Sequence, residues 1–351
     1  MKKDFWIGKN VLVTGHTGFK GSWLCQLLIE MGANITGVSL KKPISEPCLF
    51  DILELGEKLV DNRFNINDFN ECSAIINELS PNIVIHMAAQ SLVKLSYQDP
   101  IHTFNTNIIG TANLLESLRN NLSIKTILIV TSDKCYNNIE DDYLYNEDDP
   151  LGGNDPYSSS KACAELITSA YYKSFFKQRN VGVATARAGN VIGGGDWSDY
   201  RLFPDIIKAW IKNNPVIIRS PNSIRPWQHV IEPICGYLKL VEYLWDNPDN
   251  FSGGWNFGPD EGNMKTVLDT VKYSQRLWNG SSEVIFSDQN TFKEDKILKL
   301  NNQKTKSRLK INPKMNFEKT LKNTLHWYAN YYEGNNVKKI TSDQILNYLE
   351  L

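Results

Sequence analysis

The sequence predicts an α/β fold in which a doubly wound parallel sheet carries helices on both faces. Three observations support this prediction. Short apolar runs occur without polar alternation, helical patterns separate them, and a glycine-rich turn follows the first run. Such a pattern is typical of a Rossmann-like sheet. After about residue 190 the sequence becomes rich in glycines, prolines and aromatic residues, which predicts a smaller, mixed α/β C-terminal lobe.

The elements alternate along the first half of the chain. Residues 11–13 are an apolar run that ends in a glycine turn, and apolar residues then recur at helical spacing at Leu24, Leu27, Leu28 and Met31. Further strands are expected at residues 35–38, 83–85, 126–130 and 181–185, with helical patterns at 108–118 and 161–176. We therefore expect one domain at residues 1–190 and a second at 191–351, and a return of residues 225–260 to the first domain stays open.

Composition excludes several classes of partner. The 351 residues include 38 basic and 39 acidic side chains, so the formal net charge of −1 gives no reason to expect nucleic acid or an anionic membrane surface. No stretch approaches the roughly 20 apolar residues of a membrane helix. The six cysteines are scattered, with no metal-ligand spacing. We expect reduced thiols, no metal and a cytoplasmic protein.

The glycine turn has the spacing Gly-x-x-Gly-x-x-Gly at Gly15, Gly18 and Gly21, between a strand and a helix. Glycines in this position let a pyrophosphate approach the amides at the positive end of the helix. A plain strand-to-helix turn is the competing interpretation, which the position disfavours. The spacing resembles that of the short-chain dehydrogenase/reductase superfamily and implies a dinucleotide cofactor.

The end of the second strand departs from the superfamily pattern. Where an acidic side chain usually accepts the ribose hydroxyls, this chain has Ser39, followed by Lys41 and Lys42. We expect NAD, but NADP stays open because a lysine can contact a 2′-phosphate. Asn65 and Ile66 stand where the superfamily usually has Asp-Ile beside the adenine.

Tyr157 and Lys161 lie one helical turn apart and face the same way. A lysine held near a phenol favours the phenolate and is expected to bring the pKa of the phenol toward the working range. The Tyr-x-x-x-Lys spacing alone is weak evidence. Its position after the strand at residues 126–130, whose carboxyl end belongs to the ligand-binding edge of such a sheet, strengthens it.

Ser132, Asp133 and Lys134 directly follow that strand. The serine hydroxyl suits a position beside a reacting carbinol. The adjacent carboxyl and amine add a proton donor and a base, which an elimination requires and a simple oxidoreductase or epimerase does not. A solvated Asp-Lys pair at a strand end is the alternative.

Five motifs, taken in order, resemble the CDP-glucose 4,6-dehydratases, a nucleotide-sugar branch of the superfamily. They are residues 14–24, 88–97, 131–136, 187–197 and 225–230. The resemblance runs from residue 9 to about residue 332. Lys134 is its sharpest feature, because dehydratases that act on dTDP- or GDP-sugars carry Glu at that step.

The resemblance implies conversion of CDP-D-glucose to CDP-4-dehydro-6-deoxy-D-glucose. Bound NAD⁺ would take a hydride from C4 while Tyr157, aided by Lys161 and Ser132, removes the hydroxyl proton. Lys134 would then act as base at C5, Asp133 would protonate the departing C6 hydroxyl, and the hydride would return to C6. A dehydratase of another nucleotide sugar, a nucleotide-sugar 4-epimerase and a non-catalytic binding protein stay open as alternatives.

The resemblance also implies the residues of the two binding sites. The substrate, CDP-glucose, is expected to contact Asn190, Arg201, Phe203, Arg219 and Arg225, and arginines suit its phosphates because they engage oxygens bidentately. A homodimer is expected through the helices that follow residues 108 and 161. The cofactor is expected to contact Gly15, Thr17, Gly18, Phe19, Lys20, Gly21, Ser39, Asn65, Ile66, Ala88, Ala89, Gln90, Asn107, Ser132, Tyr157 and Lys161.

Overall fold

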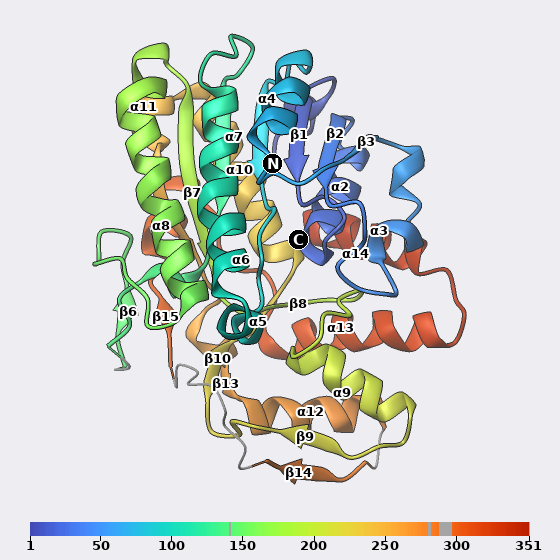
Figure 1. Cartoon of the computed structure of the whole chain (residues 1–351). Helices are drawn as coiled ribbons and strands as arrows, with labels where there is room; N and C mark the ends of the chain where they lie inside the picture. The colour runs from blue at the N-terminus through green and yellow to red at the C-terminus, as the bar shows by residue number, and fades with distance from the viewer. Residues whose placement is uncertain (140–141, 280–281, 288–296, 351) are drawn as a thin grey trace.

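The computed structural model describes residues 1–139, 142–279, 282–287 and 297–350, and its centre is a parallel sheet (Figure 1). Seven strands lie in the order β12-β7-β5-β4-β1-β2-β3, and every neighbouring pair is parallel. The predicted fold class is confirmed. The strands are β1 (Asn10–Thr14), β2 (Asn34–Ser39), β3 (Val60–Arg63), β4 (Ile83–His86), β5 (Thr126–Val130), β7 (Gly182–Ala188) and β12 (Gly253–Phe257).

Helices cover both faces of this sheet, because successive side chains of each buried strand point to opposite faces. In β1, Leu12 belongs to one hydrophobic core, whereas Val11 and Val13 belong to the other. The Leu12 face packs against α4 (Phe69–Glu78), α7 (Gly110–Leu118) and α8 (Pro156–Tyr171). The opposite face packs against α2 (Phe19–Glu30) and α10 (Ile231–Asp246).

Local signals fix the start of α8. Asp155 is its N-cap, with a carboxylate that accepts a hydrogen bond from the amide of Ser158 at 2.9 Å, and Pro156 occupies the first helical position. The helix therefore begins five residues before Lys161 and carries Tyr157 in its first turn. After Tyr171 the chain continues as a π-helical turn, Tyr172–Phe176.

A smaller lobe lies at the bottom of the view in Figure 1. It contains α9 (Leu202–Ile211), α12 (Val267–Trp278) and two short strand pairs, β9 (Val216–Ile218) with β14 (Val284–Phe286) and β10 (Ile224–Pro226) with β13 (Met264–Thr266). Between these elements the chain returns to the main sheet through α10 and β12, which pairs with β7. The two lobes are therefore interleaved in sequence.

The remaining elements are short or C-terminal. Helices α13 (Phe317–Tyr332) and α14 (Val337–Glu350) complete the core, and α14 contacts α2. None of the described helices is long and apolar enough to span a membrane, and all six cysteines are free thiols. The others are α1 (Lys3–Trp6), α3 (Leu49–Ile52), α5 (Val93–Gln98), α6 (Pro100–Phe104), α11 (Pro248–Phe251), β6 (Leu144–Tyr145), β8 (Val191–Ile192), β11 (Gln228–His229) and β15 (Lys299–Leu300).

The strand order reverses between β1 and β4, so the turns after these strands diverge at the carboxyl edge and leave a crevice. Thr14 joins the two turns, because its hydroxyl oxygen accepts hydrogen bonds from the amides of Met87 and Ala88 at 3.2 Å. Gly15 has a φ of +74°, and a Cβ there would lie 2.7 Å from the nitrogen of Ala88. Only glycine allows this approach.

Candidate active site

One cavity of about 740 Å³ opens at this edge. It is lined by every residue predicted for the cofactor, the substrate and the chemistry except Asn107. Motifs from separate stretches of the sequence therefore meet in one place.

Asn107 does not line the cavity, and its side chain is buried beneath it. The amide group accepts a hydrogen bond from the Gln90 nitrogen at 2.8 Å and donates to the Gln90 carbonyl at 2.9 Å. It also donates to the hydroxyl of Ser160 at 2.8 Å. Asn107 thus holds the backbone of Gln90, which does line the cavity, against the Tyr157 helix.

The glycine turn forms one wall of the cavity. Gly18 is the N-cap of α2 and offers no side-chain cap to the first-turn amides, and that turn contains no acidic residue. A Cβ on Gly21 would lie 2.2 Å from the carbonyl oxygen of Gly15, whereas a Cβ on Gly18 would meet only that same oxygen, at 3.4 Å. Uncapped amides at a helix N-terminus that lines a cavity fit an anionic diphosphate.

The end of the cavity near β2 is lined by polar and apolar residues, and none of the described residues that line it there is acidic. The hydroxyls of Thr17 and Ser39 are 2.6 Å apart, and Asn65 and Ile66 lie on the same lining. The nearby acid is Asp61 of β3, which bonds the Nε2 of His16 at 2.9 Å and does not line the cavity.

Tyr157 and Lys161 lie at the other end, near the carboxyl ends of β5 and β7. Burial raises the pKa of the Tyr157 phenol, against a hydrogen bond with Ser132 and the charges of Arg201 and Lys134. The fall of this pKa that we predicted is not found, because burial outweighs the groups that lower it, and Lys161 is not one of those groups. The Lys161 ammonium instead donates to the carbonyl of Val130 at 3.5 Å, and burial lowers its own pKa to about 8.

Asp133 and Lys134 form a short 3₁₀ turn, Asp133–Cys135. Ser132 caps this turn, because its hydroxyl oxygen accepts from the Lys134 amide at 3.2 Å and donates to Asp133 Oδ1 at 2.9 Å. Gly189 makes room for the buried carboxylate, since a Cβ there would lie 2.9 Å from Asp133 Oδ2. Lys134 is half-buried and lines the same cavity. A carboxyl, an amine and a phenol therefore meet at one end of the cavity.

The predicted substrate residues line the remaining wall. Arg201 donates to Asp196 Oδ2 and to the hydroxyl of Ser91, both at 3.0 Å. Arg219 reaches the carbonyl of Tyr200 at 3.5 Å. The other three are Arg225 on β10, exposed Asn190, and Phe203, whose ring packs edge-on against Trp227 at 5.8 Å. Three guanidinium groups on one wall suit a diphosphate.

Sequence reasoning missed two features of the site. Lys20 was predicted only as part of the glycine turn, yet burial, aided by the charges of Arg201 and Lys161, lowers the pKa of its ammonium to about 7. Lys94 lies over the ring of Tyr200. The lysine inside the glycine motif was a visible signal, whereas nothing in the sequence pairs Lys94 with Tyr200.

The sheet, the glycine turn and the Ser-Tyr-Lys group define a short-chain dehydrogenase/reductase-type enzyme of nucleotide-sugar metabolism. The chain belongs to the GDP-mannose 4,6 dehydratase family, whose model matches residues 12–324. It is 44% identical over 352 residues to the CDP-glucose 4,6-dehydratase of Salmonella typhimurium, covering 99% of this chain and 98% of that protein. The predicted resemblance is confirmed.

More distant relatives share the fold. The dTDP-glucose 4,6-dehydratase of Haemophilus influenzae is 25% identical, with 91% of this chain and 97% of that protein covered. The structure of the Bacillus anthracis dTDP-glucose 4,6-dehydratase in complex with NAD has a TM-score of 0.77 at 23% identity, covering 94% of this chain and 100% of that chain. The UDP-glucose 4-epimerase of Thermotoga maritima has a TM-score of 0.80 at 21% identity, covering 92% and 99%.

Proposed function

We propose that this protein is a CDP-glucose 4,6-dehydratase that uses NAD. The observation that carries the proposal is the meeting of two pairs in one cavity, Tyr157 with Lys161 and Asp133 with Lys134. A 4-epimerase needs the first pair and has no use for the second. The similarity to the Salmonella typhimurium enzyme over nearly the whole chain supports CDP-glucose as the substrate.

The residues present fit a nicotinamide dinucleotide. The turn at residues 15–21 would hold its diphosphate, and Ser39, Asn65 and Ile66 would surround its adenosine. When bound, such a cofactor would supply a hydride acceptor for C4 of the sugar and a hydride donor for C6. Lys42 lines the Ser39 end of the cavity, so NADP is included in the test below.

The chain's own groups move the protons. Tyr157, as the phenolate, removes the C4 hydroxyl proton, and the hydrogen bond of Ser132 and the charge of Arg201 oppose the effect of burial on its pKa. The resulting ketone makes the C5 proton acidic, and Lys134, as the neutral amine, removes it. Asp133 donates a proton to the C6 hydroxyl, which leaves as water.

Ser132 closes the proton balance. Its hydroxyl hydrogen-bonds both the Tyr157 phenol and Asp133 Oδ1, so the proton taken from the C4 hydroxyl can pass to the carboxylate that gave its own to the leaving water. Lys134 returns its proton to C5. The net change is loss of one water, and every group returns to its starting state.

The test is incubation of the purified protein with NAD⁺ or NADP⁺ and, separately, CDP-, dTDP-, GDP- and UDP-glucose. Mass spectrometry follows loss of water, and alkaline absorbance follows the 4-keto sugar. We expect dehydration with CDP-glucose and NAD⁺. Dehydration of another sugar alone would change the substrate and keep the mechanism. An unchanged mass with a galactose-configured product would favour the epimerase, and no turnover of any sugar would favour a binding role.

We also propose a cytoplasmic homodimer formed through α7 and α8, which lie side by side on one face of the sheet (Figure 1). Two large apolar side chains in these segments are exposed, Leu166 on α8 at 59% and Ile109, which directly precedes α7, at 47%. The six free thiols suit a reducing compartment. Sedimentation should give twice the chain mass, and Leu166→Glu should yield the monomer.

A further inference from the structure

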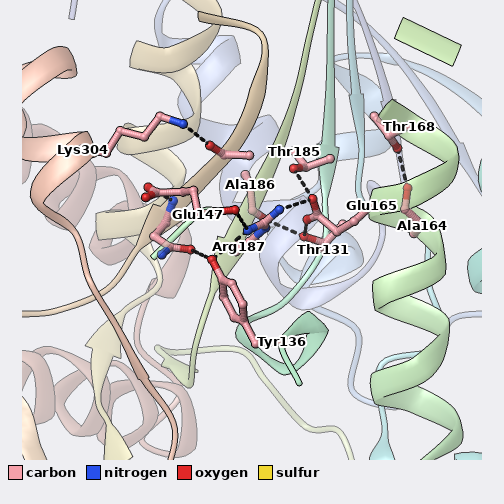
Figure 2. A network of polar contacts seen from close by, with 12 residues as sticks. Thr131, Tyr136, Glu147, Ala164, Glu165, Thr168, Thr185, Ala186, Arg187 and Lys304 are labelled. Carbon is pink, nitrogen blue, oxygen red and sulfur yellow. Dashed lines mark hydrogen bonds and ion pairs between the residues drawn. The ribbon is translucent and has the colours of Figure 1, made fainter. Parts of the chain in front are cut away.

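A buried polar network lies behind the catalytic groups, and Figure 2 shows its side chains. At its centre Arg187 Nη2 lies 2.7 Å from Glu165 Oε2, and the two side chains are only 5% and 3% exposed. Burying two charges has a large desolvation cost, which only good geometry and further hydrogen bonds offset. The proposed reaction uses neither residue directly.

Glu165 joins three elements. Its side chain extends from α8. Its carboxylate accepts one hydrogen bond from the hydroxyl of Thr131 at 2.5 Å and another from the hydroxyl of Thr185 at 2.6 Å. Thr131 immediately follows β5, and Thr185 and Arg187 lie on β7. Both carboxylate oxygens thus accept hydrogen bonds, and the carboxylate links the Tyr157 helix to the end of β5 and to β7.

Arg187 extends the network in the other direction. Its Nη1 donates to the hydroxyl of Tyr136 at 2.7 Å, and that hydroxyl donates to Asn256 Oδ1 at 2.7 Å. The guanidinium also lies against β12 at Gly254, where a Cβ would lie 2.6 Å from Nη2. Glycine at this position therefore leaves room for the pair.

The two ends of the catalytic segment are held by the two members of this pair. Thr131 precedes Ser132, Asp133 and Lys134 and bonds Glu165, and Tyr136 follows them and bonds Arg187 (Figure 2). Glu165 also lies one helical turn beyond Lys161 on α8. The network is therefore shared by the residues of the oxidation and those of the elimination.

We propose that Glu165 and Arg187 are positioning residues: the pair fixes the Asp133 segment relative to Tyr157 and Lys161, and the Glu165 carboxylate keeps the Lys161 ammonium charged. This inference rests on the proposed dehydration. Among the described residues, the titratable groups that face Lys161 are Tyr157 and Glu165 on its own helix, Cys135 on the catalytic turn, Lys20 on α2 and His86 on β4.

Among these groups Glu165 supplies the negative charge, because burial raises the pKa of the Tyr157 phenol, which is neutral near pH 7 before the reaction begins. Burial raises the pKa of the Cys135 thiol well above its ordinary value and lowers the pKa of His86 to about 3, so both groups are neutral near pH 7. Burial lowers the pKa of Lys161 to about 8, and Glu165 opposes this shift. Removing the Glu165 charge should therefore deprotonate Lys161 at lower pH.

The first test measures the pH dependence of the oxidation step, followed as single-turnover formation of the reduced cofactor. Activity that needs the Lys161 cation is lost as pH rises through its pKa. In Glu165→Gln we expect this alkaline limb to move to lower pH by about one unit. Glu242→Gln is the matched control, because it removes another buried carboxylate, which accepts a hydrogen bond from Trp6 Nε1 at 3.1 Å and does not line the cavity.

The second test separates positioning from charge. Tyr136→Phe keeps the Glu165 charge but releases one end of the catalytic segment. We expect an unmoved alkaline limb and an elimination step slowed on the order of tenfold more than oxidation, because misplacement of the base and acid affects only the later step. This variant also decides the matter if Glu165→Gln does not fold.

The positioning role is overturned if the alkaline limb of Glu165→Gln matches that of the wild type, if Glu242→Gln moves it equally, or if Tyr136→Phe slows both steps alike. The pH profile of NADH binding, followed by fluorescence, gives a readout of Lys161 that does not depend on turnover. A wild-type protein that dehydrates none of the four sugars contradicts the proposed function, whereas the binding profile of Glu165→Gln still tests the charge role.

Discussion

The ammonium of Lys94 lies 3.8 Å from the centre of the Tyr200 ring. Lys94 belongs to α5, after β4, and Tyr200 precedes α9 of the smaller lobe, with a left-handed φ of 63°. Arg201 makes a second link between the same segments through Ser91. Both contacts line the cavity, so they join the cofactor side to the substrate side.

We expect Tyr200→Leu to speed dissociation of bound nucleotide sugar by roughly threefold to tenfold, because a cation–π contact at a partly exposed site contributes about 1 kcal/mol. Stopped-flow displacement measures the rate. Lys94→Met should have the same effect, and the double variant should add nothing further. Additive effects of the two substitutions would show that the residues act separately.

Lys134→Ala should retain oxidation at C4 and lose elimination, since the C5 base is removed while Tyr157 and Lys161 remain. The expected signature is reduced cofactor that accumulates on the enzyme, read at its absorbance band, without 6-deoxy product. Normal product formation by this variant would remove Lys134 from the mechanism.

Gly21→Ala should abolish dinucleotide binding, because the new Cβ would lie 2.2 Å from the Gly15 carbonyl oxygen and would distort the turn. Gly262→Ala is the control, as no heavy atom lies within 4 Å of a Cβ there. Titration calorimetry with NAD⁺ compares the two variants. Unchanged affinity in Gly21→Ala would place the cofactor elsewhere.

His86 should make the protein sensitive to acid. Its ring bonds Thr14 and Thr111, and burial lowers its pKa to about 3, so the folded state holds it neutral while the unfolded chain binds a proton below about pH 6.5. The folded state is therefore most stable above about pH 6.5, the pKa of His86 in the unfolded chain, and its stability falls as the pH drops below that value. Between pH 7 and 5 we expect a loss of about 2 kcal/mol from this group.

Urea unfolding at both pH values tests the effect. In His86→Gln the loss of unfolding free energy between pH 7 and 5 should be smaller by about that amount. His102 is exposed, so His102→Gln should behave like the wild type. An equal pH dependence in all three proteins would remove His86 as the source.

Lys20→Met should stabilise the fold while impairing the reaction. Burial lowers the pKa of this lysine to about 7, so at neutral pH folding holds a partly charged amine in an unfavourable place beside Arg201 and Lys161. We expect the free energy of unfolding to rise by roughly 2 kcal/mol, in the pattern of stability given up at functional sites. If the variant is less stable than the wild type, the side chain of Lys20 stabilises the fold through packing, and the prediction is wrong.

The sequence predicted the buried strands and missed the edges of the sheet. β5 is wholly buried and reads as an apolar run. β3 is an edge strand, Val-Asp-Asn-Arg, that is exposed or half-exposed throughout, and its pairing with β2 depends on backbone bonds that leave no pattern. β12 begins with two glycines, so it lacks the composition of a strand.

The residues that make up the site were predicted well, and the pKa values of those residues were predicted less well. Motif residues follow strand ends, and a parallel sheet brings those ends together, so one cavity was foreseeable. The direction of the Tyr157 pKa was not, because burial outweighs the neighbouring charges and cannot be read from spacing. The pairing of Glu165 with Arg187 could not be predicted either, because the two lie 22 positions apart in the sequence and no motif links them.

The path of the chain between the lobes limits how this enzyme can be re-engineered. The chain leaves the sheet after β7, builds part of the smaller lobe, returns through α10 and β12, and leaves again. A nucleotide pocket taken from a relative therefore cannot be transplanted as a single cassette. Any chimera needs junctions on both sides of the returning segment, and a C-terminal truncation at either junction would remove strand β12 or the α12 side of the pocket.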